Sequence, residues 1–204
     1  MKPIVALSYF HRKIGPLVFY SYPENMLNEQ LSTRIANIMD QTVSEGFFTH
    51  SFEQNISNNY YFEIPSDWAR GNKDMLMISI IFDQQINSEI EQNVNILCTE
   101  FLGKLLSHEE IFTAFYINDL NNFEEQDKDL IQKNNSLIKL WVKELYWATL
   151  EETREKSEEE KIATLLNKKY IFLTLKKLSK GPIALDGLRA VSYTHLTLPT
   201  TPYV

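Results

Sequence analysis

The sequence has little of the chemistry that marks secreted or membrane-spanning proteins. Its single cysteine, Cys98, excludes an internal disulfide, and the Ile-Leu-Cys context predicts a buried thiol. No apolar run reaches the roughly 18 residues that a membrane-spanning helix needs. Residues 1–11 also lack the charged-then-apolar layout of a signal peptide. We therefore expect a cytoplasmic protein without a transmembrane segment.

The motifs of common catalytic sites are missing as well. The six glycines form no glycine-rich phosphate loop, and no serine lies in a Gly-x-Ser-x-Gly elbow. The four histidines lie far apart, without a cysteine or a second histidine at metal-ligand spacing. These absences predict a protein that is not itself an enzyme and that needs no metal ion or cofactor.

What remains is a globular composition with an uneven distribution of charge. Of the 204 residues, 44% are hydrophobic and 23% are charged, which is enough to bury a core. Residues 1–160 hold 13 basic against 26 acidic side chains, whereas residues 161–190 hold seven basic side chains against Asp186 alone. An acidic body does not attract nucleic acid, so only the basic segment is a candidate for such contact. The alternative for its lysines is the solvated face of a helix.

Hydrophobic periodicity predicts the strands and helices of the first 118 residues. We expect strands over Lys2–Phe10, Leu17–Tyr22, Phe47–Phe52, Asn58–Ile64 and Met75–Phe82, helices over Asn28–Val43 and Ser88–Leu106, and a turn over Asn55–Ser57. Ser88 and Glu91 have the spacing of a capping box. The strand Met75–Phe82 is apolar enough to be central, and residues 108–118 fit a short helix or a strand equally. The order β-β-α-β-β-β-α predicts an α+β domain with a five-stranded antiparallel sheet and helices on one or both faces.

Three further segments follow. Residues 119–160 predict a long helix, Asp127–Lys156, and the acidic stretch Glu151–Glu160 is either a solvated extension of that helix or a linker. Residues 161–190 contain two helical patterns around a Gly-Pro break, which is how a helix-turn-helix or winged helix opens, here truncated. Residues 191–204 begin with a stretch that resembles a translated sequencing adapter, so we predict a non-native tail there. A threonine-rich natural tail is the alternative.

The N-terminal hairpin resembles that of a known family. Residues Tyr9–Asn25 run from aromatic residues through Gly-Pro and an apolar stretch to Tyr-Pro. With the element order, this pattern resembles longin domains, in particular the longin domain of the nitrogen-permease-regulator-like proteins, over residues 1–118. Winged-helix modules follow the longin domain in those proteins, in line with residues 161–190. The resemblance implies a non-catalytic scaffold or regulator of a small GTPase, of the kind that serves vesicle trafficking. Its expected partners are a small GTPase or another longin-like subunit, with a dimer as one form, and any membrane contact would be peripheral and through partners.

The resemblance also implies one chemically active residue. One member type of the family activates a GTPase through an arginine in a loop of its longin domain. Arg70 has a similar context here, because it lies in the loop Pro65–Asp74 ahead of the strand Met75–Phe82. An arginine finger is a permanently charged guanidinium that stabilises the phosphoryl-transfer transition state in the partner's nucleotide site. The alternative is a solvated turn residue beside Asp67 and Asp74, for which a weak surface ion pair is one arrangement.

Aromatic residues supply the candidates for partner contact. Tyr20 and Tyr22 lie on the hairpin, Trp68 lies beside Arg70, and Trp141 and Leu145 lie on one stripe of the long helix. Such residues form a docking surface where they are exposed, and the alternative is that they are cross-strand pairs and core. A second class of function is a transcription regulator with a winged-helix DNA-binding domain, in which only the truncated C-terminal segment contacts nucleic acid.

Overall fold

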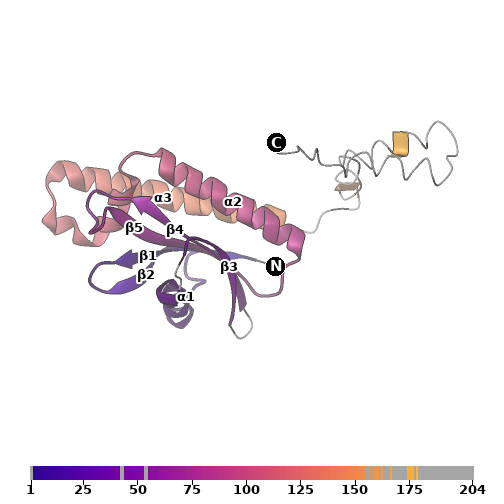
Figure 1. Ribbon diagram of the computed structural model, residues 1–204, viewed down its shortest axis with the longest axis horizontal. Helices are drawn as coiled ribbons and strands as arrows, with labels where there is room; N and C mark the ends of the chain where they lie inside the picture. Colours follow the sequence, from indigo (N-terminus) through magenta and orange to yellow (C-terminus); the bar gives the residue numbers. More distant parts are fainter. Residues whose placement is uncertain are drawn as a thin grey trace, which may run out of the picture. The chain divides into compact units, whose positions relative to one another are not determined.

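The computed structural model describes residues 2–41, 44–52 and 55–154, together with residues 157, 159, 160, 162, 166, 174–176 and 178 (Figure 1). It divides into two compact units, residues 1–154 and 155–204. The expected winged-helix segment, residues 161–190, is described only at the few positions just given, and the expected tail, residues 191–204, lies outside the described residues. The helices and strands named below all belong to the first unit.

The elements of this unit follow the predicted order. They are β1 (Ile4–His11), β2 (Gly15–Tyr22), α1 (Glu29–Gln41), β3 (Gly46–Phe52), β4 (Asn55–Pro65), β5 (Lys73–Phe82), α2 (Ser88–Ser107), the 3₁₀ segment η1 (Ile111–Asn122) and α3 (Glu125–Glu152). The order β-β-α-β-β-β-α is therefore confirmed, with the long helix after it. The segment that the sequence left open becomes largely 3₁₀-helical rather than a strand.

The five strands form one antiparallel sheet in the order β2-β1-β5-β4-β3. β5 lies at its centre, as its continuous apolar sequence predicts. Side chains on both of its faces, such as Met77 and Ile78, are fully buried. The edge strands β2 and β3 carry half-buried or exposed residues throughout.

Helices cover both faces of the sheet (Figure 1). α1 packs on one face over a small core, to which it contributes Ile35, Ile38 and Met39 at helical spacing. α2, η1 and α3 cover the other face over a larger core. This larger core joins side chains of β1, β4 and β5 to side chains of the three helical segments. The sheet is thus a middle layer between two helical layers.

Two local predictions are wrong. The N-cap of α2 is Asn87 rather than Ser88, because the Asn87 side chain accepts a hydrogen bond from the backbone N–H of Ile90 at 2.8 Å. Asparagine and serine cap helices equally well, so two adjacent candidates could not be separated by spacing. The predicted turn Asn55–Ser57 is instead the first part of β4, paired with the end of β3. Pairing within the sheet here outweighs the low strand propensity of asparagine and serine.

α3 packs as part of the same unit as the sheet. The buried Asn134 donates from Nδ2 to the Glu110 carbonyl oxygen at 3.0 Å and to Thr113 Oγ1 at 2.9 Å. Asn135 donates to the Ala114 carbonyl oxygen at 3.4 Å. These bonds fasten η1 to the long helix. Among the described residues, none of the helices has both the length and the apolar content to span a bilayer.

Candidate partner-binding site at the loop end of the sheet

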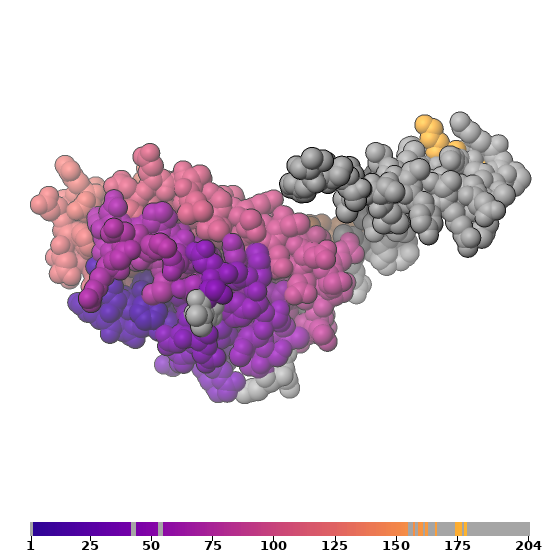
Figure 2. All heavy atoms as spheres, viewed as in Figure 1, coloured from indigo at the N-terminus to yellow at the C-terminus, as the bar shows by residue number. Residues whose placement is uncertain are grey.

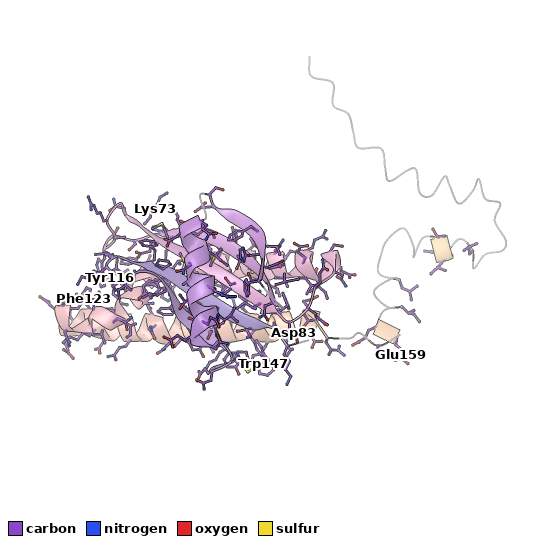
Figure 3. The ribbon with its side chains drawn as sticks, turned by 90° about the horizontal axis from the view of Figure 1, so that it is seen from below. Lys73, Asp83, Tyr116, Phe123, Trp147 and Glu159 are labelled. Atoms are coloured by element: carbon purple, nitrogen blue, oxygen red, sulfur yellow. The ribbon has the colours of Figure 1, made fainter. Side chains whose placement is uncertain are left out.

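The β1–β2 hairpin, the β4–β5 loop and the 3₁₀ segment η1 meet at one end of the sheet, which we call the loop end. The antiparallel register places the β1–β2 hairpin, with His11 opposite Gly15, beside the β4–β5 loop, with Pro65 opposite Lys73. η1 lies against both connections. Figure 2 shows the indigo hairpin, the purple-to-magenta loop and the pink η1 gathered at one end of this unit, and Figure 3 labels Lys73, Tyr116 and Phe123 toward that end. Residues far apart in sequence are therefore neighbours here.

The β4–β5 loop, residues 66–72, closes on its own backbone. Ser66 N–H donates to the Asn72 carbonyl at 3.1 Å, Ala69 N–H to the Ser66 carbonyl at 3.2 Å, and Asn72 N–H to the Ala69 carbonyl at 3.0 Å. Gly71 and Asn72 take φ values of +95° and +58°, which these two residue types tolerate best. The backbone of the loop is thus held in one conformation by its own hydrogen bonds.

Trp68 anchors this loop to η1. Its ring stacks on Phe123 with centroids 4.7 Å apart, and meets Phe112 and Tyr116 edge-on at 5.5 and 5.1 Å. The side chain is half-buried. Trp68 is predicted from the sequence to bind a partner, and in the structure its ring packs on three aromatic rings of η1 and its C-terminal end.

Arg70 is exposed at the tip of the loop. Among the residues that the structure describes, neither Asp67 nor Asp74 forms an ion pair with it. Arg70 is thus a solvent-exposed residue on an ordered loop, an arrangement that fits both the arginine finger and the solvated turn residue that is its alternative.

A polar cluster behind the loop was not anticipated from the sequence. Arg12 donates to the Tyr116 hydroxyl and lies over the Tyr116 ring at 4.9 Å, and His11 Nε2 is 3.8 Å from Asp119 Oδ2. The cavity between these groups has a volume of about 20 Å³, room for one water molecule. It cannot hold an organic substrate. The cluster connects the hairpin to η1, although Arg12 and Tyr116 are more than 100 positions apart in the sequence. A local sequence pattern could not have revealed a contact between residues so far apart.

Asp74 connects this cluster to the loop. Burial raises the pKa of the Asp74 carboxyl, while the Ser66 hydroxyl and the Arg12 guanidinium favour its charged form. Asp74 is the second residue of β5, directly after the Arg70 loop. Ser66 and Arg12 offset only part of the effect of burial, so the pKa of the Asp74 carboxyl stays above its ordinary value.

An open groove runs beside the loop. It has a volume of about 360 Å³ and separates the end of β4 and the start of the loop from the C-terminal end of α2. Its walls include Pro65, Asp67, Leu106 and His108. Leu106 is 54% exposed, so the groove offers an apolar contact as well as charge.

Tyr20 and Tyr22 lie elsewhere, in the half of β2 remote from the loop end, where Tyr22 pairs with Val5. The Tyr20 hydroxyl donates to Glu24 Oε1 at 2.8 Å, and burial together with this hydrogen bond raises the Tyr20 pKa. Lys143 Nζ lies 5.9 Å from the Tyr20 ring and 5.5 Å from the Tyr22 ring. Both tyrosines are half-buried and face α3 across the edge of the sheet.

Trp141 and Leu145 separate in the structure. Trp141 is half-buried beside His108, at a ring distance of 5.9 Å, in a shallow groove between α2 and α3. Leu145 is only 5% exposed and belongs to the core. A small part of Leu145 also lines this groove, so a partner contact there stays a prediction that its burial does not favour. The candidate residues thus lie in three separate places. Arg70 and Trp68 lie at the loop end, Tyr20 and Tyr22 lie on β2, and Trp141 and Leu145 lie on α3.

No model of a known protein family matches the chain, and a search of curated proteins finds no match either. The longin resemblance therefore rests on the hairpin and on the element order. Within the described residues, no three His, Cys, Asp or Glu side chains are grouped so that they could hold a metal ion.

Proposed function

We propose that this chain regulates a small GTPase through protein contacts of a longin-like domain, with Arg70 as an arginine finger. One observation carries the proposal: Arg70 is an exposed guanidinium, without an ion-pair partner among the described residues, on a loop held by its own backbone bonds and by Trp68. In this role the chain acts on the nucleotide that is bound to its partner.

The loop that carries Arg70 is preorganised, and this supports its use as an arginine finger. A finger stabilises the charge that develops in the phosphoryl-transfer transition state, and such a residue accelerates hydrolysis by about 10³- to 10⁵-fold. The gain is largest when the donor is already fixed, because no ordering entropy is then spent on reaching the transition state. The anchored loop and the open groove beside it, which can receive a partner segment, both suit this use.

The N-terminal hairpin and the strand order support the choice of partner. The element order over residues 4–107 is the one on which the longin resemblance was based. That resemblance implies contacts with a small GTPase or with another longin-like subunit. A second form of the proposal is a scaffold that binds the small GTPase without accelerating GTP hydrolysis. This form does not require Arg70 to act as an arginine finger.

The test measures GTP hydrolysis by purified small GTPases from the source organism, with and without the full chain. We expect acceleration by the parent, loss of acceleration by Arg70→Ala and Arg70→Lys, and retention by Arg34→Ala. Lysine fails because it lacks the planar fork of donors. Arg34 is a matched control, an exposed arginine on α1.

Equal acceleration by the parent and Arg70→Ala would refute the finger. Binding without acceleration by either protein would reduce the function to a scaffold. Absence of both binding and acceleration across the GTPases tested would overturn the proposal.

A further inference from the structure

The outer surface of α3 carries an unusual line of residues. Lys133, Leu140 and Trp147 are spaced by seven residues, which is two helical turns, so they form one ridge. All three are exposed, Leu140 at 51% and Trp147 at 58%. We call this line the outer ridge. Figure 3 labels Trp147 at the margin of the molecule.

The ridge lies opposite the buried face of α3. Ile131, Ile138, Val142 and Leu145 mark the face that enters the core. At 100° per residue, Leu140 and Trp147 project about 180° from that face. Neighbouring elements flank the helix on its sides, where Lys143 contacts Tyr20 of β2 and Glu144 pairs with Lys104 of α2 at 2.7 Å. The ridge itself is left uncovered within the described unit.

The ridge is complementary to itself under a two-fold axis. If two α3 helices pack antiparallel with Leu140 on the axis, Leu140 meets its own copy and Lys133 meets Trp147 of the other chain, twice. A lysine over an indole ring is a favourable cation–π contact. Each surface then uses the same residues, which is the defining property of an isologous dimer.

The charges on the helix fit the same pairing. Glu144 and Glu151 flank Trp147 at three and four residues' distance, so Lys133 of the second chain would approach two carboxylates, which also pair with Lys104 and Arg154 of their own chain. A parallel arrangement would instead place Lys133 beside Lys133. Three turns from the centre, Asp129 would meet Glu151, and these like charges limit the contact to its middle turns. A short contact of this kind belongs to the small, weak class of interfaces, below about 1,200 Å².

We propose that the outer ridge of α3 binds a second copy of this chain in a weak, antiparallel, two-fold dimer. This inference does not depend on Arg70 or on a GTPase. The ridge and the loop end use different residues, so a dimer leaves both Arg70 loops available to partners.

The first test is analytical ultracentrifugation of the full chain from low micromolar to submillimolar concentration. We expect a concentration-dependent dimer whose dissociation constant rises about tenfold or more in Trp147→Ala and in Lys133→Glu. Ile96→Ala is the matched control, because Ile96 is 56% exposed on α2 and lies off the ridge. A chain that stays monomeric, or a dimer that neither ridge variant weakens, would overturn the proposal.

The second test locates the axis. Cys98 is the single cysteine and is 2% exposed, so Leu140→Cys adds the one reactive thiol of this unit. A residue on a two-fold axis meets its own copy at the Cβ separation of about 3.5–4.5 Å that a disulfide needs. Mild oxidation should therefore link Leu140→Cys chains into covalent dimers much faster than Ile96→Cys chains. Equal rates for the two variants would refute a dimer in which Leu140 meets its own copy.

Discussion

Replacement of Trp68 by alanine should loosen the Arg70 loop while leaving Arg70 in place. Trp68 makes three ring contacts, with Phe112, Tyr116 and Phe123. Aromatic pairs contribute about 0.5–1.5 kcal/mol each beyond the area they bury. Truncation of a fully buried tryptophan costs about 3–5 kcal/mol. Because Trp68 is half-buried, we expect the free energy of unfolding to fall by about 2–3 kcal/mol.

Two measurements check this value. Urea denaturation followed by far-UV circular dichroism gives the loss of stability, which corresponds to a melting temperature lower by roughly 5–10 °C for a unit of this size. Hydrogen exchange should become faster at the Ala69 and Asn72 amides, whose bonds close the loop. Trp68→Phe should restore part of both effects, because phenylalanine keeps some of the ring contacts.

Trp147→Ala is the matched control for the loss of an indole. Trp147 is 58% exposed, so this variant at low protein concentration should change stability by no more than about 0.5–1 kcal/mol. A Trp68→Ala variant that loses no more stability than Trp147→Ala, with unchanged exchange at Ala69 and Asn72, would show that the aromatic contacts do not hold the loop.

Three further outcomes follow from buried groups. Asn134→Ala breaks two hydrogen bonds to η1 and should lower the free energy of unfolding by about 2–3 kcal/mol in urea titrations, whereas the exposed Ser136→Ala should change it by less than about 0.5 kcal/mol. The raised pKa of Asp74 means that the folded state holds this proton to a higher pH than the unfolded chain does, so its contribution to stability falls as pH rises from about 4. Asp74→Asn should therefore gain stability relative to the parent between acidic and neutral pH, and a pH-independent difference would contradict the raised pKa. Burial raises the pKa of Cys98 to about 12, so a thiol reagent at mildly alkaline pH should label the unfolded chain and leave the folded chain unlabelled.

The fold was largely predictable because its signals are local and strong. The apolar run Met75–Phe82 identified the central strand, and the four-residue spacing in α1 and α3 identified two helices. The paired strands of the hairpin followed from the Gly-Pro turn between them. These features depend on neighbours in the sequence, where periodicity is informative.

The site was less predictable because it is assembled from distant segments. The loop with Arg70 could be named, but its anchoring by Trp68 on Phe123 depends on a contact between residues 55 positions apart. Leu145 and Trp141 share a stripe and both line the groove between α2 and α3, yet Leu145 is almost fully buried and Trp141 is only half-buried. Sequence periodicity shows that a helix has an apolar face, but the packing of the whole unit decides what covers it.

Binding to a small GTPase in its transition-state form is the most direct test of the proposed role of Arg70. The full chain and its Arg70→Ala variant should be titrated against the GTPase loaded with GDP and aluminium fluoride, which mimics the transferring phosphoryl group, and against the GTPase with a non-hydrolysable GTP analogue. A residue that acts on the transition state contributes little to ground-state binding. We therefore predict that Arg70→Ala weakens binding to the aluminium fluoride form by about tenfold or more and leaves binding to the GTP-analogue form nearly unchanged. Equal affinities of the parent and the variant for the aluminium fluoride form would contradict the account.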